Sequence, residues 1–237
     1  MITIRSRCRQ VWLTTPSDKA VAELLVSRDG MDADLAAHAA RVAQGHIGRA
    51  RHIARSEEAR NWRAKILAIP AKLRSVSDCL AIADELVKDA ADEAARLVAD
   101  SDTKEKADLQ QALGAGTKGV KPRNTQAALK DLEEQQKARL KRIQRDTLDR
   151  ALTELTTYYR DIFGLQTKSL EPINAEYLGV LQQMADSFSA AETLRKITAI
   201  LDAREALNTN VAPLLAMEAM LLSLRGDEMS QTVGFGT

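Results

Sequence analysis

The longest uninterrupted helical pattern in the chain runs from residue 124 to about residue 163, and it restricts the possible folds more than any other feature. No glycine or proline breaks it before that point, and leucine and isoleucine recur at three- and four-residue steps, with three longer gaps, at Leu129, Leu132, Leu140, Ile143, Leu148, Leu152, Leu155 and Ile162. Such a helix would extend about 60 Å at a rise of 1.5 Å per residue. We interpret the densely charged stretch from Lys130 to Arg150 as a solvated helix face with ion pairs four residues apart.

The composition supports an all-α fold. Aromatic residues make up only 3% of the 237 residues, whereas alanine and leucine are abundant. A sheet-rich domain would normally use more β-branched and aromatic side chains. The formal net charge is +1, so no global electrostatic field attracts the chain to nucleic acid or to an anionic membrane.

Three short helices are expected near the N-terminus. Thr15 is the predicted cap of the first, with Pro16 as its first helical residue, and the helix should end at Arg28-Asp29-Gly30. The second should cover about residues 34–44 and the third about residues 48–55. Together they predict a compact helical subdomain.

A larger helical bundle is expected to follow. Ser56 should begin a helix that ends before Pro70, and Ser75 should cap a long helix that continues through at least Leu97. Further helices are predicted near residues 174–186, 190–208 and 211–225. Residues 114–124 should form a flexible loop, and the tail 226–237 should be disordered.

The sequence shows no nucleophile, base or metal cluster typical of an enzyme. Cys8 and Cys79 lie far apart, and His38, His46 and His52 lack the spacing of a zinc site, so no metal is expected. The glycine-rich stretch 114–119 has the order Thr-Lys-Gly and no preceding strand, so it is a linker and not a phosphate loop. Residues 44–52 contain two arginines and two histidines, which suit either a modest phosphate-binding patch or a solvated helix start.

No membrane segment is predicted, because no apolar run reaches about 18 residues. The N-terminus also lacks the apolar core of a signal peptide, so a cytoplasmic protein is expected. The first nine residues, MITIRSRCR, alternate in character, which predicts one strand with Arg5, Arg7 and Arg9 on the same face.

The chain resembles the replication clamp loaders of the AAA+ family in several places. Ser6-Arg7-Cys8 is similar to the SRC motif that closes their nucleotide-binding domain, and residues 40–50 match the pattern A-x-x-A-x-G-x-x-x-x-A of their helical lid. Residues 158–162 resemble the central helix of their collar, and residues 208–218 resemble its final helix. The resemblance covers about residues 2–225 and is closest to the delta-prime family of bacterial DNA polymerase III, of actinobacterial type.

This resemblance implies a domain organisation. Residues 1–11 would be the end of the AAA+ domain, residues 12–56 the lid, residues 57–225 the collar, and residues 226–237 a tail. The chain would then be a C-terminal fragment, with the Walker motifs and the family's zinc-binding cysteines upstream. The sensor 2 arginine of the motor subunits corresponds to Gly48, and Arg49 would point about 100° away from that position on a helix. No cofactor is therefore expected in this fragment.

The resemblance also implies a function. Arg7 would be an arginine finger that acts in trans on ATP bound to a neighbouring motor subunit, with Ser6 and Cys8 supporting it. The collar would join the gamma/tau motor subunits and the delta subunit in a pentamer that loads the sliding clamp onto primer–template DNA. The fragment itself would have no catalytic activity, although it would belong to the polymerase III holoenzyme. A gamma/tau-type motor fragment and a free-standing helical adaptor remain alternatives.

Overall fold

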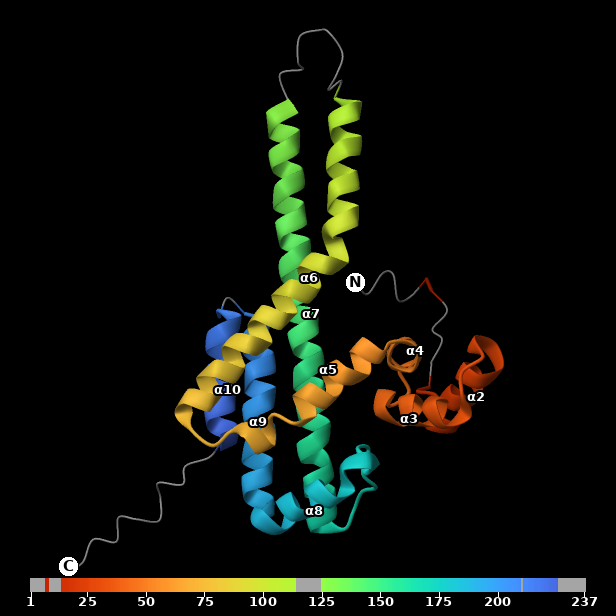
Figure 1. The fold of residues 1–237 in the computed structure, drawn as a ribbon, viewed down its shortest axis with the longest axis vertical. Coiled ribbons are helices and arrows are strands. Elements are labelled where there is room, and N and C mark those ends of the chain that lie inside the picture. Colours follow the sequence, from red (N-terminus) through yellow and green to blue (C-terminus); the bar gives the residue numbers. More distant parts are fainter. Residues whose placement is uncertain (1–6, 9–13, 114–124, 210, 226–237) are drawn as a thin grey trace, which may run out of the picture. The chain divides into compact units, whose positions relative to one another are not determined.

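The computed structural model describes residues 7–8, 14–113, 125–209 and 211–225, and every regular element in these residues is helical (Figure 1). The predicted all-α class is therefore confirmed for this part of the chain. Of the predicted N-terminal strand, only Arg7 and Cys8 are described, and they form a turn and a bend. The predicted loop 114–124 and the predicted tail 226–237 lie outside the described residues.

The chain divides into two compact units. Residues 1–64 and 173–176 form the N-terminal unit, and residues 65–172 and 177–237 form the bundle unit. The division falls within α5 (Glu57–Leu67), whereas the clamp-loader resemblance placed a boundary at residue 56. The short segment 173–176, which follows α7 in the chain, belongs to the N-terminal unit although its neighbours in sequence belong to the bundle unit.

Three short helices build most of the N-terminal unit: α2 (Asp18–Asp29), α3 (Ala33–Ala43) and α4 (Ile47–Arg55). Their shared core is rich in alanine and contains Val21, Leu25, Ala36, Ala39, Ala40, Val42, Ala43, Ala50, Ile53 and Ala54. Small side chains allow short helices to approach closely, so a small core can reach the packing density of a protein interior. The predicted three-helix subdomain is present.

The start of α2 differs from the prediction. Ser17, and not Thr15, is the cap, because its side chain accepts a hydrogen bond from the Ala20 N–H at 3.3 Å. Pro16 therefore precedes the helix, which begins at Asp18. The side chain of a cap residue satisfies one of the free N–H groups of the first turn, and Ser17 does so here. Thr15 and Pro16 instead pass close to Gly45.

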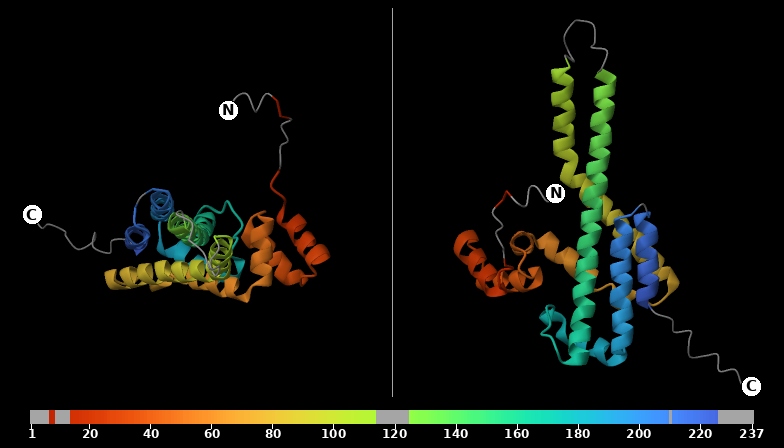
Figure 2. Two further views of the ribbon diagram at one scale, coloured as in Figure 1. Left: turned by 90° about the horizontal axis from the view of Figure 1, so that it is seen from above. Right: turned by 180° about the vertical axis from the view of Figure 1, so that it is seen from behind.

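The bundle unit contains α6 (Val76–Ala112), α7 (Thr125–Thr167), α8 (Leu178–Ser187), α9 (Ala190–Leu207) and α10 (Pro213–Arg225). Two short 3₁₀ turns, at Pro70–Lys72 and Ala175–Tyr177, complete the described elements. The second half of α7 packs against α6, α8 and α9, and α10 packs against α6 and α9 (Figure 2). This half of α7 supplies much of the core, with Leu148, Ala151, Leu152, Leu155, Tyr158, Tyr159 and Ile162 buried.

The helix ends in the bundle unit are set by local hydrogen bonds. Ser75 and Asp78 form a reciprocal capping box at the start of α6, as the predicted cap requires. The predicted end of the long helix near residue 163 is too early, because α7 continues to Thr167. It stops where Lys168 adopts a positive φ of 53° and the Ser169 N–H bonds the Gly164 carbonyl at 3.1 Å. This arrangement is a Schellman ending, built here without a glycine at the left-handed position.

Beyond the bundle, the C-terminal part of α6 and the first half of α7 continue as an antiparallel pair that we call the arm (Figure 1). Arg139 on α7 donates to Glu105 on α6 at 2.8 Å and also binds Asp102, and Lys106 lies 3.4 Å from Glu133. Hydrogen bonds from Arg139 and Gln136 lower the pKa of Glu105 to about 2. The ion pairs named here join two helices, whereas pairs four residues apart along α7 itself were expected from the sequence.

Candidate functional site

Arg7, the predicted arginine finger, lies on the surface of the protein. Its side chain and that of Cys8 are both exposed, whereas Ser6 lies outside the described residues. Residues 9–13, which connect Arg7 and Cys8 to the first helix, also lie outside the described residues. An exposed guanidinium can reach a partner molecule, and its planar fork of N–H donors suits phosphate oxygens.

The glycine and alanines of the lid-like pattern have a packing role. Ala40, Ala43 and Ala50 are buried in the core of the N-terminal unit. Gly45 lies between α3 and α4 with φ 82°, where an added Cβ would be 2.3 Å from Thr15 Cγ2 and 2.9 Å from the Pro16 carbonyl oxygen. A side chain at position 45 is therefore excluded by both backbone conformation and space.

Gly48, which the clamp-loader resemblance aligns with the sensor 2 arginine, is in the first turn of α4. An added Cβ there would meet only the His46 ring, at 3.4 Å, and φ is not positive. The Nδ1 atom of His46 accepts the Arg49 N–H at 3.1 Å and so caps the helix. The fold thus has room for a larger residue at position 48, and glycine is not required there by packing.

The basic stretch 44–52 is partly neutralised. Arg51 donates to Asp29 at 2.6 Å, and Arg55 lies 3.1 Å from the same carboxylate. The hydrogen bond from Arg51 holds the pKa of Asp29 below its usual value. Arg51 therefore connects α4 to the end of α2, which weakens the interpretation of this stretch as a phosphate-binding patch.

A polar cluster that the sequence did not predict holds segment 173–176 in the N-terminal unit. Arg63 of α5 donates to Glu176 at 2.8 Å and to the side-chain carbonyl of Asn174, and Arg41 of α3 donates to the Ile173 carbonyl at 3.0 Å. Arg63 is 5% exposed and Asn174 is fully buried. These partners lie more than 100 residues apart in the chain, and no local pattern signals such a contact.

Electrostatics in this cluster favour an ionised Glu176. Burial alone would raise its pKa, but a backbone hydrogen bond and the bond from Arg63 outweigh that effect, so the pKa lies below its usual value. The nearby His38, 3.9 Å from the same carboxylate, is half-buried, and burial lowers its pKa. The cluster thus contains a charged Arg–Glu pair with a largely neutral histidine beside it. Its contacts hold segment 173–176 in the N-terminal unit.

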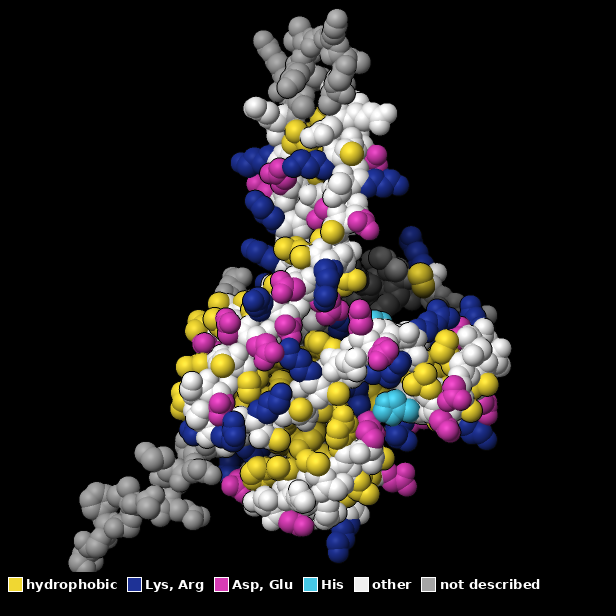
Figure 3. Space-filling view, viewed as in Figure 1, with side chains coloured by type: hydrophobic (Ala, Val, Ile, Leu, Met, Phe, Trp, Pro, Cys, Tyr) yellow, Lys and Arg dark blue, Asp and Glu magenta, His cyan; other side chains and the backbone are white. Residues whose placement is uncertain are grey.

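Leucines are exposed at heptad spacing on two adjacent helices of the bundle unit. Leu194 and Leu201 lie seven residues apart on α9, and Leu215 and Leu222 lie seven residues apart on α10. Residues at this spacing share one helix face. Leu215 is 60% exposed, and hydrophobic side chains reach the surface on the side of α6 and α10 (Figure 3). Exposed apolar side chains that are grouped in this way are typical of surfaces that bind another protein.

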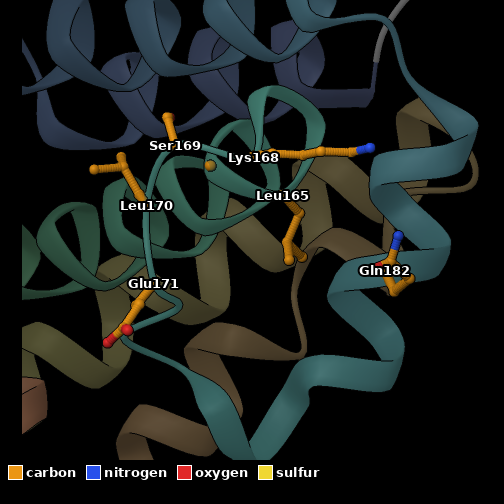
Figure 4. Close-up of a pocket in the computed structure, with 7 residues that line it drawn as sticks. Leu165, Lys168, Ser169, Leu170, Glu171 and Gln182 are labelled. Carbon is orange, nitrogen blue, oxygen red and sulfur yellow. The ribbon is translucent and has the colours of Figure 1, made fainter.

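A shallow hollow of about 470 Å³ lies where α7 meets the loop to α8. It is lined by Gly164, Leu165, Lys168, Ser169, Leu170, Glu171 and Gln182, and the Lys168 and Glu171 side chains point in opposite directions (Figure 4). The charged groups do not converge on a common point, so the hollow does not have the arrangement of a catalytic site.

No cluster of three or more histidine, cysteine or acidic side chains could hold a metal ion within the part of the chain that the structure describes. Among the described helices, none combines the length and the apolar character needed to cross a membrane. Comparison of the chain with protein-family models, curated proteins and solved structures found no significant match.

Proposed function

We propose that the chain is the lid-and-collar part of a delta-prime-type subunit of a bacterial clamp loader, an assembly subunit located in the cytoplasm. The observation that carries this proposal is the pair of exposed leucine faces on α9 and α10, in the region that resembles the collar. A collar subunit needs apolar surface that its neighbours cover. The packing of the lid-like pattern around Gly45 gives further support, since each small residue of the pattern fills a tight position.

In this proposal the bundle unit binds the gamma/tau motor subunits and the delta subunit. The assembled complex would then hold the sliding clamp and primer–template DNA. ATP would bind to the neighbouring motor subunits, and no cofactor would bind to this chain. Arg7 would approach ATP from the adjacent subunit, where its guanidinium would neutralise charge that develops on the phosphate oxygens.

Size-exclusion chromatography with light scattering tests the assembly role. The chain, mixed with the motor and delta subunits of the same organism, should elute as one stoichiometric complex. Leu215→Ser should weaken assembly about 10- to 100-fold, because burying a leucine at an interface is worth about 1.5–3 kcal/mol. Leu97→Ser is the matched control, since Leu97 is 62% exposed on α6 and belongs to neither of the proposed leucine faces, so it should leave assembly unchanged.

Two outcomes would contradict the assembly role. If the wild-type chain elutes alone at micromolar concentration, the free-standing adaptor becomes the better interpretation. If Leu97→Ser and Leu215→Ser weaken assembly equally, the leucine faces do not form the interface.

The role of Arg7 has its own test, in the assembled complex. Arg7→Ala should lower the DNA-stimulated ATPase rate of the assembled complex at least tenfold while leaving assembly intact, since a finger acts on the transition state and not on binding of the collar. Arg28→Ala removes another arginine from the surface of the N-terminal unit and serves as the control. An unchanged ATPase rate in the Arg7→Ala complex would exclude the finger role.

A further inference from the structure

A row of basic side chains lies on the arm portion of α7. Lys137, Lys141 and Arg145 follow one another at four-residue steps, and Arg142 lies beside them. All four are exposed. Residues four apart share a helix face, so the first three line up along about 12 Å of helix. We call these four residues the α7 basic stripe.

Residues seven positions before and after Lys141 lie on the same face of α7 and show where that face is covered. Leu148 follows Lys141 by seven residues on the same helix face, and it is buried in the bundle. Glu134 precedes Lys141 by the same interval and is exposed. The stripe therefore lies on a face of α7 that neighbouring helices cover from Leu148 onward. The same face is exposed to solvent in the arm, toward the N-terminal end of α7.

The cations of the stripe differ from the other basic residues nearby. Within the described residues, Arg139, Lys106, Arg150 and Arg204 each bind a carboxylate, whereas no ion pair involves the four stripe residues. The acidic groups engaged in this way are Glu93, Asp102, Glu105, Glu133 and Asp149. Unpaired cations on one face produce a local positive potential even though the net charge of the chain is only +1. Exposed charges act over about one Debye length, roughly 8 Å at physiological salt, so this local charge decides what binds.

We propose that the α7 basic stripe binds the phosphate backbone of nucleic acid. A linear row of cations suits a nucleic-acid strand, which carries one negative charge on the phosphate of every nucleotide. A membrane surface is a poorer partner, because helices that lie in the interface present a large exposed apolar face beside their basic residues. On this part of α7 the apolar residues Leu140 and Ile143 are half-buried.

The proposed binding is independent of base sequence. No aromatic residue occurs between residues 126 and 157, so stacking on bases is excluded along this stretch of α7. Without stacking or base contacts, affinity comes from counterion release and should fall steeply with salt. Four phosphate contacts correspond to a slope of log K against log salt of about −3.6 on duplex DNA and about −2.8 on a single strand.

Fluorescence anisotropy with a short labelled duplex and the corresponding single strand tests the proposal on the whole 237-residue chain. Affinity is measured between about 50 and 200 mM salt. The variant Lys137→Ala/Lys141→Ala/Arg145→Ala should bind at least tenfold more weakly at low salt, with a slope about 2 to 3 units less steep. Circular dichroism establishes that the variant remains helical.

The matched control removes the same amount of charge elsewhere in the bundle unit. Lys72, Lys88 and Lys104 are exposed and take part in no ion pair among the described residues, so their triple alanine variant should bind within about twofold of the wild type. Equal loss in both triple variants, or no binding by the wild type at the lowest salt, would overturn the proposal. Competition by polyglutamate as effective as competition by DNA would also overturn it, in favour of an acidic protein partner.

This inference does not depend on the proposed clamp-loader function. The chain is tested alone, without motor or delta subunits, so failure to assemble leaves the DNA result interpretable. Loss of DNA binding, conversely, leaves the leucine faces on α9 and α10 intact.

Discussion

Replacing Gly45 with alanine should destabilise the N-terminal unit by about 3 kcal/mol. The left-handed conformation costs a residue with a Cβ about 1–2 kcal/mol, and overpacking adds about 1–3 kcal/mol. The new Cβ would lie 2.3 Å from Thr15 Cγ2 and 2.9 Å from the Pro16 carbonyl oxygen. The threonine side chain can rotate away, but the carbonyl belongs to the backbone, so the chain before α2 must shift.

Gly30→Ala is the matched control for Gly45→Ala. Gly30 also has a positive φ, 66°, but an added Cβ would find nothing within 4 Å. Gly30→Ala should therefore lose only the stability that the left-handed conformation costs, about 1 kcal/mol. Hydrogen exchange of peptides from α2–α4 measures both, with about 100-fold faster exchange expected for Gly45→Ala and less than about tenfold for Gly30→Ala. Equal effects would show that position 45 tolerates a side chain.

Replacing Arg63 with alanine should cost the N-terminal unit about 3 kcal/mol. Removing one partner of a buried charged pair leaves the other without compensation, and such losses are typically 3–5 kcal/mol. Here Asn174 is fully buried, while Glu176 retains some access to water, which places the expected loss at the lower end. The released segment 173–176 should become sensitive to proteolysis, and limited digestion with mass spectrometry measures that release.

Two further variants show how much of the stability loss in Arg63→Ala comes from the lost charge, from the lost planar donor geometry, and from shortening an arginine side chain. Arg63→Lys keeps the charge but loses the planar fork of donors, so an intermediate loss of about 1–2 kcal/mol is expected. Arg74→Ala removes an exposed arginine 3.8 Å from Asp78 and should cost less than about 0.5 kcal/mol. If Arg63→Ala behaves like Arg74→Ala, the cluster does not hold the segment.

Acidification should reduce the difference between wild type and Arg63→Ala. The pKa of Glu176 is lower in the folded protein than in the unfolded chain. The unfolded state therefore binds more protons around that pH, and stability rises with pH. The contribution of the pair is fully present above the usual carboxyl pKa and is lost as the pH falls through the lower, folded value.

Local patterns in the sequence were sufficient to place most helices. Ser75 and Ser189 act as caps where side-chain oxygens meet free N–H groups, and α9 spans Ala190–Leu207 close to the range expected from sequence. The all-α class followed from the scarcity of aromatic residues and from the helical period of the leucines. These features depend on residues three to seven positions apart, so the sequence displays them directly.

Buried polar side chains were not predictable in the same way. The residues around Lys196 in the sequence do not distinguish it from a surface lysine. In the structure it is nevertheless buried and donates a hydrogen bond to the Leu224 carbonyl at the end of α10. Arg63 was one of several arginines in a helix and proved to be the anchor of segment 173–176. Their partners are 28 and more than 100 residues distant in the chain, and such pairings depend on how helices pack.

The sequence by itself determined the helical class, the approximate helix ranges, and the small residues around Gly45. Only the tertiary structure decided which faces are covered: it paired Arg139 with α6, buried Leu148, left the α7 basic stripe open, and exposed the leucines of α9 and α10. The physical reason is the range of the interactions involved. Helix formation is governed by hydrogen bonds between near neighbours, whereas the exposure of a face depends on which distant helix packs against it.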